Sequence, residues 1–146
     1  MEAAGARGIP QVVSVGALDM VNFGARESVP HRFEDRTFVV HNPTVTLMRT
    51  TAAENAELGH RIGRKVTDAV GPTAVMLPLE GVSGIDKEGT PFWDPEADAA
   101  LFNAVRAEFR NSTVELVERE LNINDPGFGT EAARLLHSMI QSSTEA

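Results

Sequence analysis

The residues whose types and spacing best fit ligand binding lie together between positions 39 and 54. Thr51 and Glu54 have the spacing of a capping box, in which each side chain accepts a hydrogen bond from the other residue's backbone amide. Such a pair begins a helix and leaves other first-turn amides open to phosphate or carboxylate. Arg49 adds a planar guanidinium that suits either anion. We therefore expect a polar loop over residues 41–51 that leads into an anion-binding helix start, although a capped helix beside a surface arginine shows the same pattern.

The elements that must position these residues are predicted to alternate between strands and helices. Apolar, β-branched runs indicate strands at residues 9–17, 37–40, 73–79 and 113–117. Helix starts are indicated at Thr51, Asp94 and Asp125, and a helix stop at Asn111. Residues 18–36 are expected to form a long loop. Because each crossover is long enough to return the chain, the pattern predicts one three-layer α/β domain over residues 1–146, Rossmann-like or flavodoxin-like, with a mainly parallel sheet.

Polar or glycine-rich stretches follow the predicted strands at the edge where parallel sheets bind ligands. These stretches are residues 16–22, 41–51, 81–86 and 122–125. We expect Arg49 to balance phosphate charge, the Thr50 and Thr51 region to donate amides, and residues 81–84 to form a second cradle. The predicted ligand-binding residues are Gly16, Asp19, His41, Asn42, Arg49, Thr50, Thr51, Gly81, Ser83 and Gly84.

Other side chains at this edge suggest a metal or a reaction. Asp19 and Asp86 are expected near Mg²⁺, held through water when phosphates are present, although such aspartates more often cap helices or form turns. Ser83 lacks the surrounding motif of a nucleophile elbow, and residues 81–84 lack both common phosphate-loop fingerprints. Trp93 either packs over the core or forms a lid that stacks on adenine.

Composition excludes several classes of protein. The net charge is -8 and the chain has no clustered Lys/Arg run, which argues against nucleic-acid binding. The absence of cysteine excludes disulfides, thiolate metal sites and a cysteine nucleophile. No segment has the roughly 18 continuous apolar residues of a membrane span. We expect a cytoplasmic protein that contacts neither membrane nor nucleic acid.

Four motifs together resemble a specific family. They are VGALDMVNFG at residues 15–24, HNPxVTLMRTT at 41–51, PLxGVS at 78–83 and FxDPEAD at 92–98. The family is one of uncharacterised bacterial, fungal and plant proteins that includes the amino-terminal region of the tomato mosaic virus resistance protein. The resemblance implies that each member consists of two consecutive Rossmann-like subdomains. This chain resembles the second of them. The resemblance implies an ATP-binding protein that dimerises.

The sequence therefore predicts a domain that binds a phosphate-bearing small molecule, with ATP and Mg²⁺ as the expected ligand. One alternative is an enzyme that acts on a small carboxylate or phosphorylated metabolite, with His41 as acid or base. Another is a structural half that docks with a separate first subdomain. Because one sheet edge is expected to be uncovered, the chain should form a homo-oligomer or bind such a partner. The sequence assigns no reaction.

Overall fold

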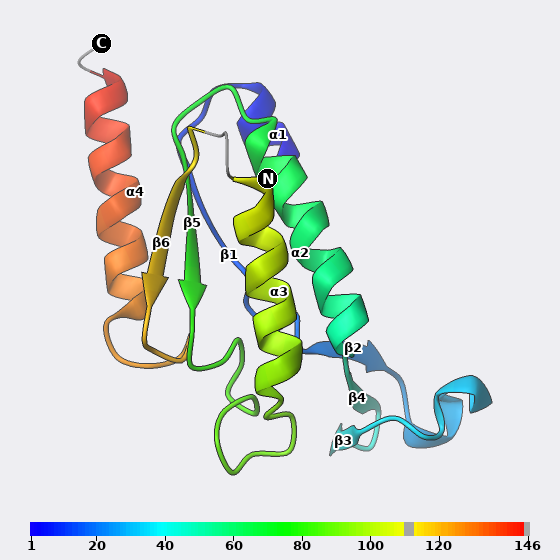
Figure 1. Cartoon of the computed structure of the whole chain (residues 1–146). Coiled ribbons are helices and arrows are strands. Elements are labelled where there is room, and N and C mark those ends of the chain that lie inside the picture. The colour runs from blue at the N-terminus through cyan, green and yellow to red at the C-terminus, as the bar shows by residue number, and fades with distance from the viewer. Residues whose placement is uncertain (110–112, 145–146) are drawn as a thin grey trace.

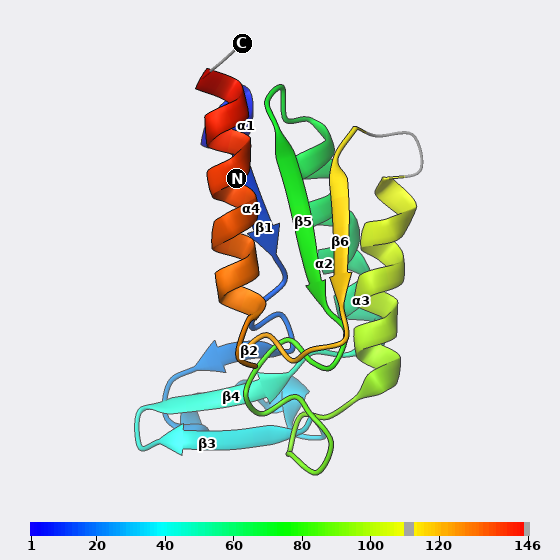
Figure 2. The same ribbon diagram turned by 90° about the vertical axis from the view of Figure 1, so that its left-hand side faces the viewer.

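A three-stranded parallel sheet forms the middle layer of the domain. The computed structural model describes residues 1–109 and 113–144. The strand order is β1 (Gln11–Ser14), β5 (Thr73–Pro78) and β6 (Glu115–Arg119). Helices α2 (Ala52–Thr67) and α3 (Pro95–Glu108) cover one face, and α4 (Phe128–Thr144) covers the other (Figures 1 and 2). This arrangement confirms the predicted three-layer α/β fold with a parallel sheet.

The second predicted strand belongs to a different sheet. Strands β3 (Phe38–Asn42) and β4 (Val45–Arg49) form an antiparallel hairpin, and β2 (Met20–Phe23) pairs with the other edge of β4. The prediction of a polar loop over residues 41–51 was therefore wrong. Residues 46–49 are buried as a central strand, and that burial depends on pairing partners which local sequence does not show.

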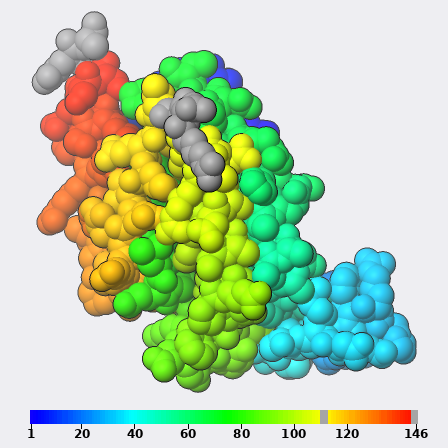
Figure 3. Space-filling view, viewed as in Figure 1, coloured from blue at the N-terminus to red at the C-terminus, as the bar shows by residue number. Residues whose placement is uncertain are grey.

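The predicted loop over residues 18–36 is also more ordered than expected. Besides β2 it contains two 3-10 turns, η1 (Arg26–Ser28) and η2 (His31–Phe33). The rings of Phe23 and Phe33 lie 5.7 Å apart, and the Arg26 guanidinium lies 4.1 Å from the Phe38 ring centre. These contacts fold residues 20–49 into a lobe that projects from the main body, at the lower right of Figure 3.

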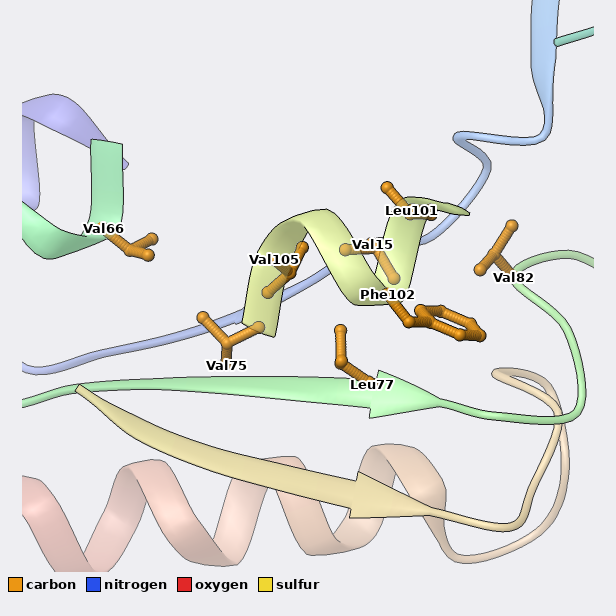
Figure 4. Packing of buried hydrophobic residues seen from close by; sticks show 8 residues of the cluster. All are labelled: Val15, Val66, Val75, Leu77, Val82, Leu101, Phe102 and Val105. Atoms are coloured by element: carbon orange, nitrogen blue, oxygen red, sulfur yellow. The ribbon is translucent and has the colours of Figure 1, made fainter. Parts of the chain in front are cut away.

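Alternate residues of β5 build the core on both sides of the sheet. Val75 and Leu77 pack with Val66, Leu101 and other residues beneath α2 and α3 (Figure 4). Met76 points the other way and packs with residues of β6 and α4, namely Val117 and Phe128. The central strand is fully buried, as the continuous apolar run predicts for a parallel sheet.

The two helices on the first face approach closely because α2 carries glycine at the contact. A Cβ atom built on Gly59 would lie 2.5 Å from the Leu101 carbonyl oxygen and 2.8 Å from Ala104 Cβ. A side chain there requires the helices to separate. The small residue thus determines how near α3 lies to α2, and with it the position of the first turn of α3.

Two of the predicted helix starts are confirmed in atomic detail. The Glu54 amide donates to Thr51 Oγ1 at 3.2 Å, and the Thr51 amide donates to Glu54 Oε2 at 2.8 Å, which completes the capping box. Asp94 caps α3 through the Ala97 amide at 3.0 Å. The third helix begins later than predicted, at Phe128, because Asp125 instead accepts from the Asn122 amide. The predicted stop at Asn111 lies outside the described residues.

A short helix, α1 (Glu2–Ala6), precedes β1. Within the described part of the chain, no helix combines the length and apolar character needed to cross a membrane.

Candidate functional site

The loops that follow the parallel strands meet at one edge of the sheet, as predicted. The Ala17 amide donates to the Val82 carbonyl at 2.8 Å, and the Ile123 amide donates to the Gly81 carbonyl at 3.0 Å. The Thr50 amide donates to the Asp19 carbonyl at 2.9 Å, which joins the end of β4 to the same group. Residues 16–19, 49–51, 81–86 and 122–125 therefore lie together although they are far apart in the chain.

Arg49 lies inside this edge rather than on its surface. Its relative exposure is 6%, and its Nη2 atom donates to Asp98 Oδ1 at 2.7 Å and to Asp86 Oδ1 at 3.3 Å. Its Nε atom donates to the Phe92 carbonyl at 2.7 Å. The guanidinium is thus engaged by protein groups, and it links β4 to the loop after β5 and to α3.

The acidic partners of Arg49 are crowded and buried, which changes their protonation. Burial raises the pKa of Asp98 to about 7, and the nearby Asp86 carboxylate adds to the rise while the Arg49 hydrogen bond opposes it. Burial also raises the pKa of Asp19, against the lowering effect of the hydrogen bond from Ser83. The site therefore favours keeping a proton on Asp98 up to about neutral pH.

Asp19 and Asp86 were predicted to lie near Mg²⁺. Asp86 uses both oxygens, since Oδ1 accepts from Arg49 and Oδ2 accepts from the Val82 amide at 2.9 Å. Asp19 Oδ2 accepts from Ser83 Oγ at 2.6 Å, and its Oδ1 has no hydrogen-bond partner among the described residues. A metal bound between the two would have to displace the bonds of Asp86, so these residues do not fit a shared Mg²⁺ ion as they stand.

Two asparagines and Thr50 complete the buried polar cluster. Thr50 Oγ1 lies 2.8 Å from the Leu18 carbonyl and 2.9 Å from Asn55 Oδ1. Asn122 Nδ2 donates to the Ser83 carbonyl at 2.8 Å and to the Asp86 carbonyl at 3.1 Å. Asn122 therefore holds the loop at residues 81–86 in a closed shape, which Gly81 permits through its positive φ of 120°.

Sequence reasoning missed Asn55 and Asp98. Each lies three residues before a leucine of the buried helix face, Leu58 and Leu101 respectively. A polar residue at such a position lies on the buried face of the helix, and a buried polar group needs a hydrogen-bond partner. That signal could have identified both residues.

His41 and Asn42 lie away from the other predicted ligand-binding residues. Both are exposed at the end of β3, where Asn42 pairs with Val45. The four steps of β4 from Val45 to Arg49 span about 13 Å. The Asn42 side chain instead forms the hairpin turn, since Oδ1 accepts from the Thr44 amide at 2.9 Å.

Other predicted residues remain accessible at the edge. Gly16, Thr51 and Gly84 are exposed. Ala17, beside Gly16, has a φ of 58° and is the one non-glycine residue with positive φ among those described. Such a backbone is uncommon for a residue with a Cβ atom, and its amide is held by Val82.

A cavity of about 660 Å³ opens beside this edge, between α3 and the loops that follow β5 and β6. The loop before α3 lies at the bottom of the molecule in Figure 1. Asp98 connects the cavity to the buried cluster, because it lines the cavity and bonds to Arg49. The lining residues are Leu79, Glu80, Lys87, Glu88, Trp93, Pro95, Asp98, Ala99, Phe102, Arg106, Asn122 and Asp125.

The fold and this edge define a Rossmann-like α/β domain with a buried polar cluster and an adjoining cavity at the carboxyl ends of its strands. The chain belongs to the family described as uncharacterised protein family (UPF0261), whose C-terminal domain model matches residues 1–140. The resemblance inferred from the sequence motifs is thereby confirmed.

Relatives in bacteria and a plant support this assignment. A UPF0261 protein of Clostridium tetani is 50% identical over 141 residues, which cover 97% of this chain and 35% of that protein. A UPF0261 protein of Rhizobium meliloti is 50% identical over 125 residues, or 85% of this chain and 31% of that protein. The ToMV resistance protein Tm-1(GCR237) of tomato is 38% identical over 139 residues, or 94% and 18%. The chain thus spans about a third of the length of these bacterial relatives.

Proposed function

We propose that this domain binds a phosphate-bearing small molecule, foremost ATP with Mg²⁺, at the carboxyl ends of its parallel strands. The observation that carries the proposal is the cavity of about 660 Å³ beside those strand ends. Its volume lies within the usual range for small-molecule sites, and open α/β sheets bind ligands at this edge. The family resemblance, which implies ATP binding, supports the choice of nucleotide.

The roles of individual residues differ from the sequence-based expectation. Arg49 is engaged by Asp86 and Asp98, so the proposal gives it the task of shaping the site rather than contacting phosphate. Lys87 is exposed and lines the cavity, and it is the proposed phosphate contact. Mg²⁺ would arrive as the complex with the phosphates, because ATP carries its own oxygen ligands.

Calorimetric titration of Mg-ATP into the chain tests the proposal, at concentrations that detect millimolar affinity. We expect saturable binding that Lys87→Ala weakens several-fold, with the larger loss at low salt. Lys65→Ala is the matched control, because Lys65 is an exposed lysine of α2 paired with Glu2 at 3.2 Å. The absence of binding heat for the unmodified chain would show that it is not a nucleotide binder by itself.

A second candidate is an enzyme that acts on a small carboxylate or phosphorylated metabolite. Asp98 favours it, since a buried carboxyl with a pKa of about 7 that lines a cavity suits proton transfer at neutral pH. His41, the residue first expected in that role, is exposed on the projecting lobe. Turnover that Asp98→Asn abolishes while ligand binding persists would establish this candidate.

The proposal also covers the partner of the domain and its cellular location. The bacterial relatives extend well beyond the region matched by this chain, which supports a partner in the form of a first subdomain. A second copy of the chain is the alternative partner that we propose. We retain a cytoplasmic location as the setting in which such a domain would meet ATP.

A further inference from the structure

The charge of the cavity restricts what can occupy its interior. The lining carries four carboxylates, Glu80, Glu88, Asp98 and Asp125, and two cations, Lys87 and Arg106. Arg106 is already paired, since its Nε and Nη2 atoms each lie 2.6 Å from Glu118 Oε1. A phosphate group in the interior would face an excess of negative charge at short range. The phosphate end of a nucleotide is therefore poorly matched to the interior.

The apolar part of the lining matches the other end of a nucleotide. Trp93 is 49% exposed although it is large and aromatic, and it lines the cavity with Phe102 and Leu79. Exposed aromatic rings stack on nucleobases of every kind. The carboxylates add acceptors for amino groups, which are hydrogen-bond donors. A flat ring that bears an exocyclic amino group satisfies both parts of the lining.

Asp98 is the carboxylate best placed to recognise such an amino group. Its exposure is only 7%, and Arg49 fixes its Oδ1 atom at 2.7 Å. A buried and oriented acceptor discriminates more strongly than an exposed one, because a ligand that presents a carbonyl oxygen in place of the amino group is repelled by it. Glu80 and Glu88 are exposed, and their bonds to a ligand would compete with water.

We propose that the cavity binds the amino-bearing nucleobase of the nucleotide, with Trp93 as the stacking wall and Asp98 as the acceptor for the amino group. The phosphates then remain at the mouth beside Lys87. This inference rests on the proposed nucleotide binding and adds which end of the ligand enters the cavity.

Trp93 is the only tryptophan in the chain, so its fluorescence reports directly on occupancy. The probes are Mg-ATP, adenosine, inosine and tripolyphosphate, all at pH 8, where Asp98 with its pKa of about 7 is mainly the ionised acceptor. Adenosine should quench Trp93 saturably, with a Kd within about tenfold of that for Mg-ATP, and tripolyphosphate should have no effect. Inosine, which carries a carbonyl oxygen in place of the amino group, should bind about tenfold or more weakly.

Asp98→Asn tests the acceptor itself. An amide offers both donor and acceptor, so the variant should bind adenosine and inosine within a few-fold of each other. Glu96→Gln is the matched control, because Glu96 is an exposed carboxylate in the same helical turn, and it should keep the preference for adenosine.

A second variant leaves the buried cluster intact. Trp93→Ala, followed by calorimetry, should weaken adenosine binding about tenfold or more. Binding of Mg-ATP without adenosine, or equal affinity of the unmodified chain for adenosine and inosine, would overturn the inference and leave the proposed function standing. If no probe binds at all, both fail.

Discussion

Arg49 is paired with two carboxylates inside the protein. Its Nη2 atom is shared between Asp86 and Asp98, and all three side chains are buried. An arginine in this position orients three segments of chain, namely β4, the loop after β5 and the start of α3. The geometry of the candidate site therefore depends on a residue that a ligand need not touch.

Removal of Arg49 is the first prediction at this scale. Arg49→Ala leaves Asp86 and Asp98 buried without their cation, and we expect the free energy of unfolding to fall by about 3–5 kcal/mol. Urea denaturation followed by circular dichroism measures the loss. Arg61→Ala is the control, since the Arg61–Glu57 pair is exposed and its loss should leave the free energy of unfolding nearly unchanged. Similar small losses for both variants would contradict a structural role for Arg49.

The protonation of Asp98 gives the second prediction. Its pKa rises to about 7 in the folded protein from an ordinary value of 3.8. The native state therefore binds more protons than the unfolded state between these values, and the stabilisation is present below pH 4 and lost as the pH rises through 7. The stability of the unmodified chain should fall relative to Asp98→Asn between pH 5 and pH 8, by on the order of 2 kcal/mol.

Chemical denaturation of both proteins at the two pH values checks this difference, and Glu96→Gln again serves as control. Comparison with a variant is required because other groups shift in the opposite direction. The Arg36 guanidinium, for example, lowers the pKa of Glu54. A constant difference between the unmodified chain and Asp98→Asn across the pH range would contradict the prediction.

At the scale of elements, the contact between α2 and α3 sets the position of the site. Gly59 lies against the Leu101 carbonyl, and a Cβ atom there would come within 2.5 Å of it. The first turn of α3, which carries Asp98 and the cap Asp94, is placed by this packing. A change at Gly59 should therefore affect both stability and the cavity.

We predict that Gly59→Ala lowers the free energy of unfolding by about 1–3 kcal/mol, because the added methyl group must push the helices apart. Gly129→Ala is the matched control, since Gly129 lies in α4 with nothing within 4 Å of an added Cβ atom. That change should instead stabilise the helix by up to about 1 kcal/mol. Thermal unfolding of both variants measures the contrast, and equal effects would show that the α2–α3 contact tolerates a larger residue.

At the scale of the whole molecule, both sheets end in edge strands. Strands β1 and β6 flank the parallel sheet, and β2 and β3 flank the projecting antiparallel sheet. Val21 and Val40 on that lobe are 40% and 58% exposed. Edge strands and exposed apolar side chains are typical of surfaces that meet another chain or domain.

We predict that the part of the Clostridium tetani relative outside the matched region, produced separately, binds this chain with equal stoichiometry. Sedimentation velocity of the two proteins alone and mixed measures the association. The chain alone over the same concentration range is the control, and it distinguishes a partner domain from self-association. If the two parts sediment independently and the chain is monomeric, both the binding of a partner domain and self-association are contradicted.

The sequence by itself determined those features that depend on neighbouring residues. The capping box at Thr51, the Asp94 cap and the apolar runs of β1, β5 and β6 all follow from local hydrogen bonding and burial, and the structure has them where they were expected. The meeting of loops at one sheet edge also followed, because parallel strands share a direction.

Only the tertiary structure decided which residues that edge exposes. The local sequence predicts that Arg49 is a surface contact for an anion. In the structure it is buried against partners that lie 37 and 49 residues away in the chain. The local sequence predicts a loop at residues 45–49. In the structure they form a central strand, because β2 and β3 supply hydrogen bonds on its two sides. The cavity, likewise, exists only between segments distant in the chain. Long-range pairing determines burial, and burial determines whether a charged side chain is free to bind a ligand or is held within the protein.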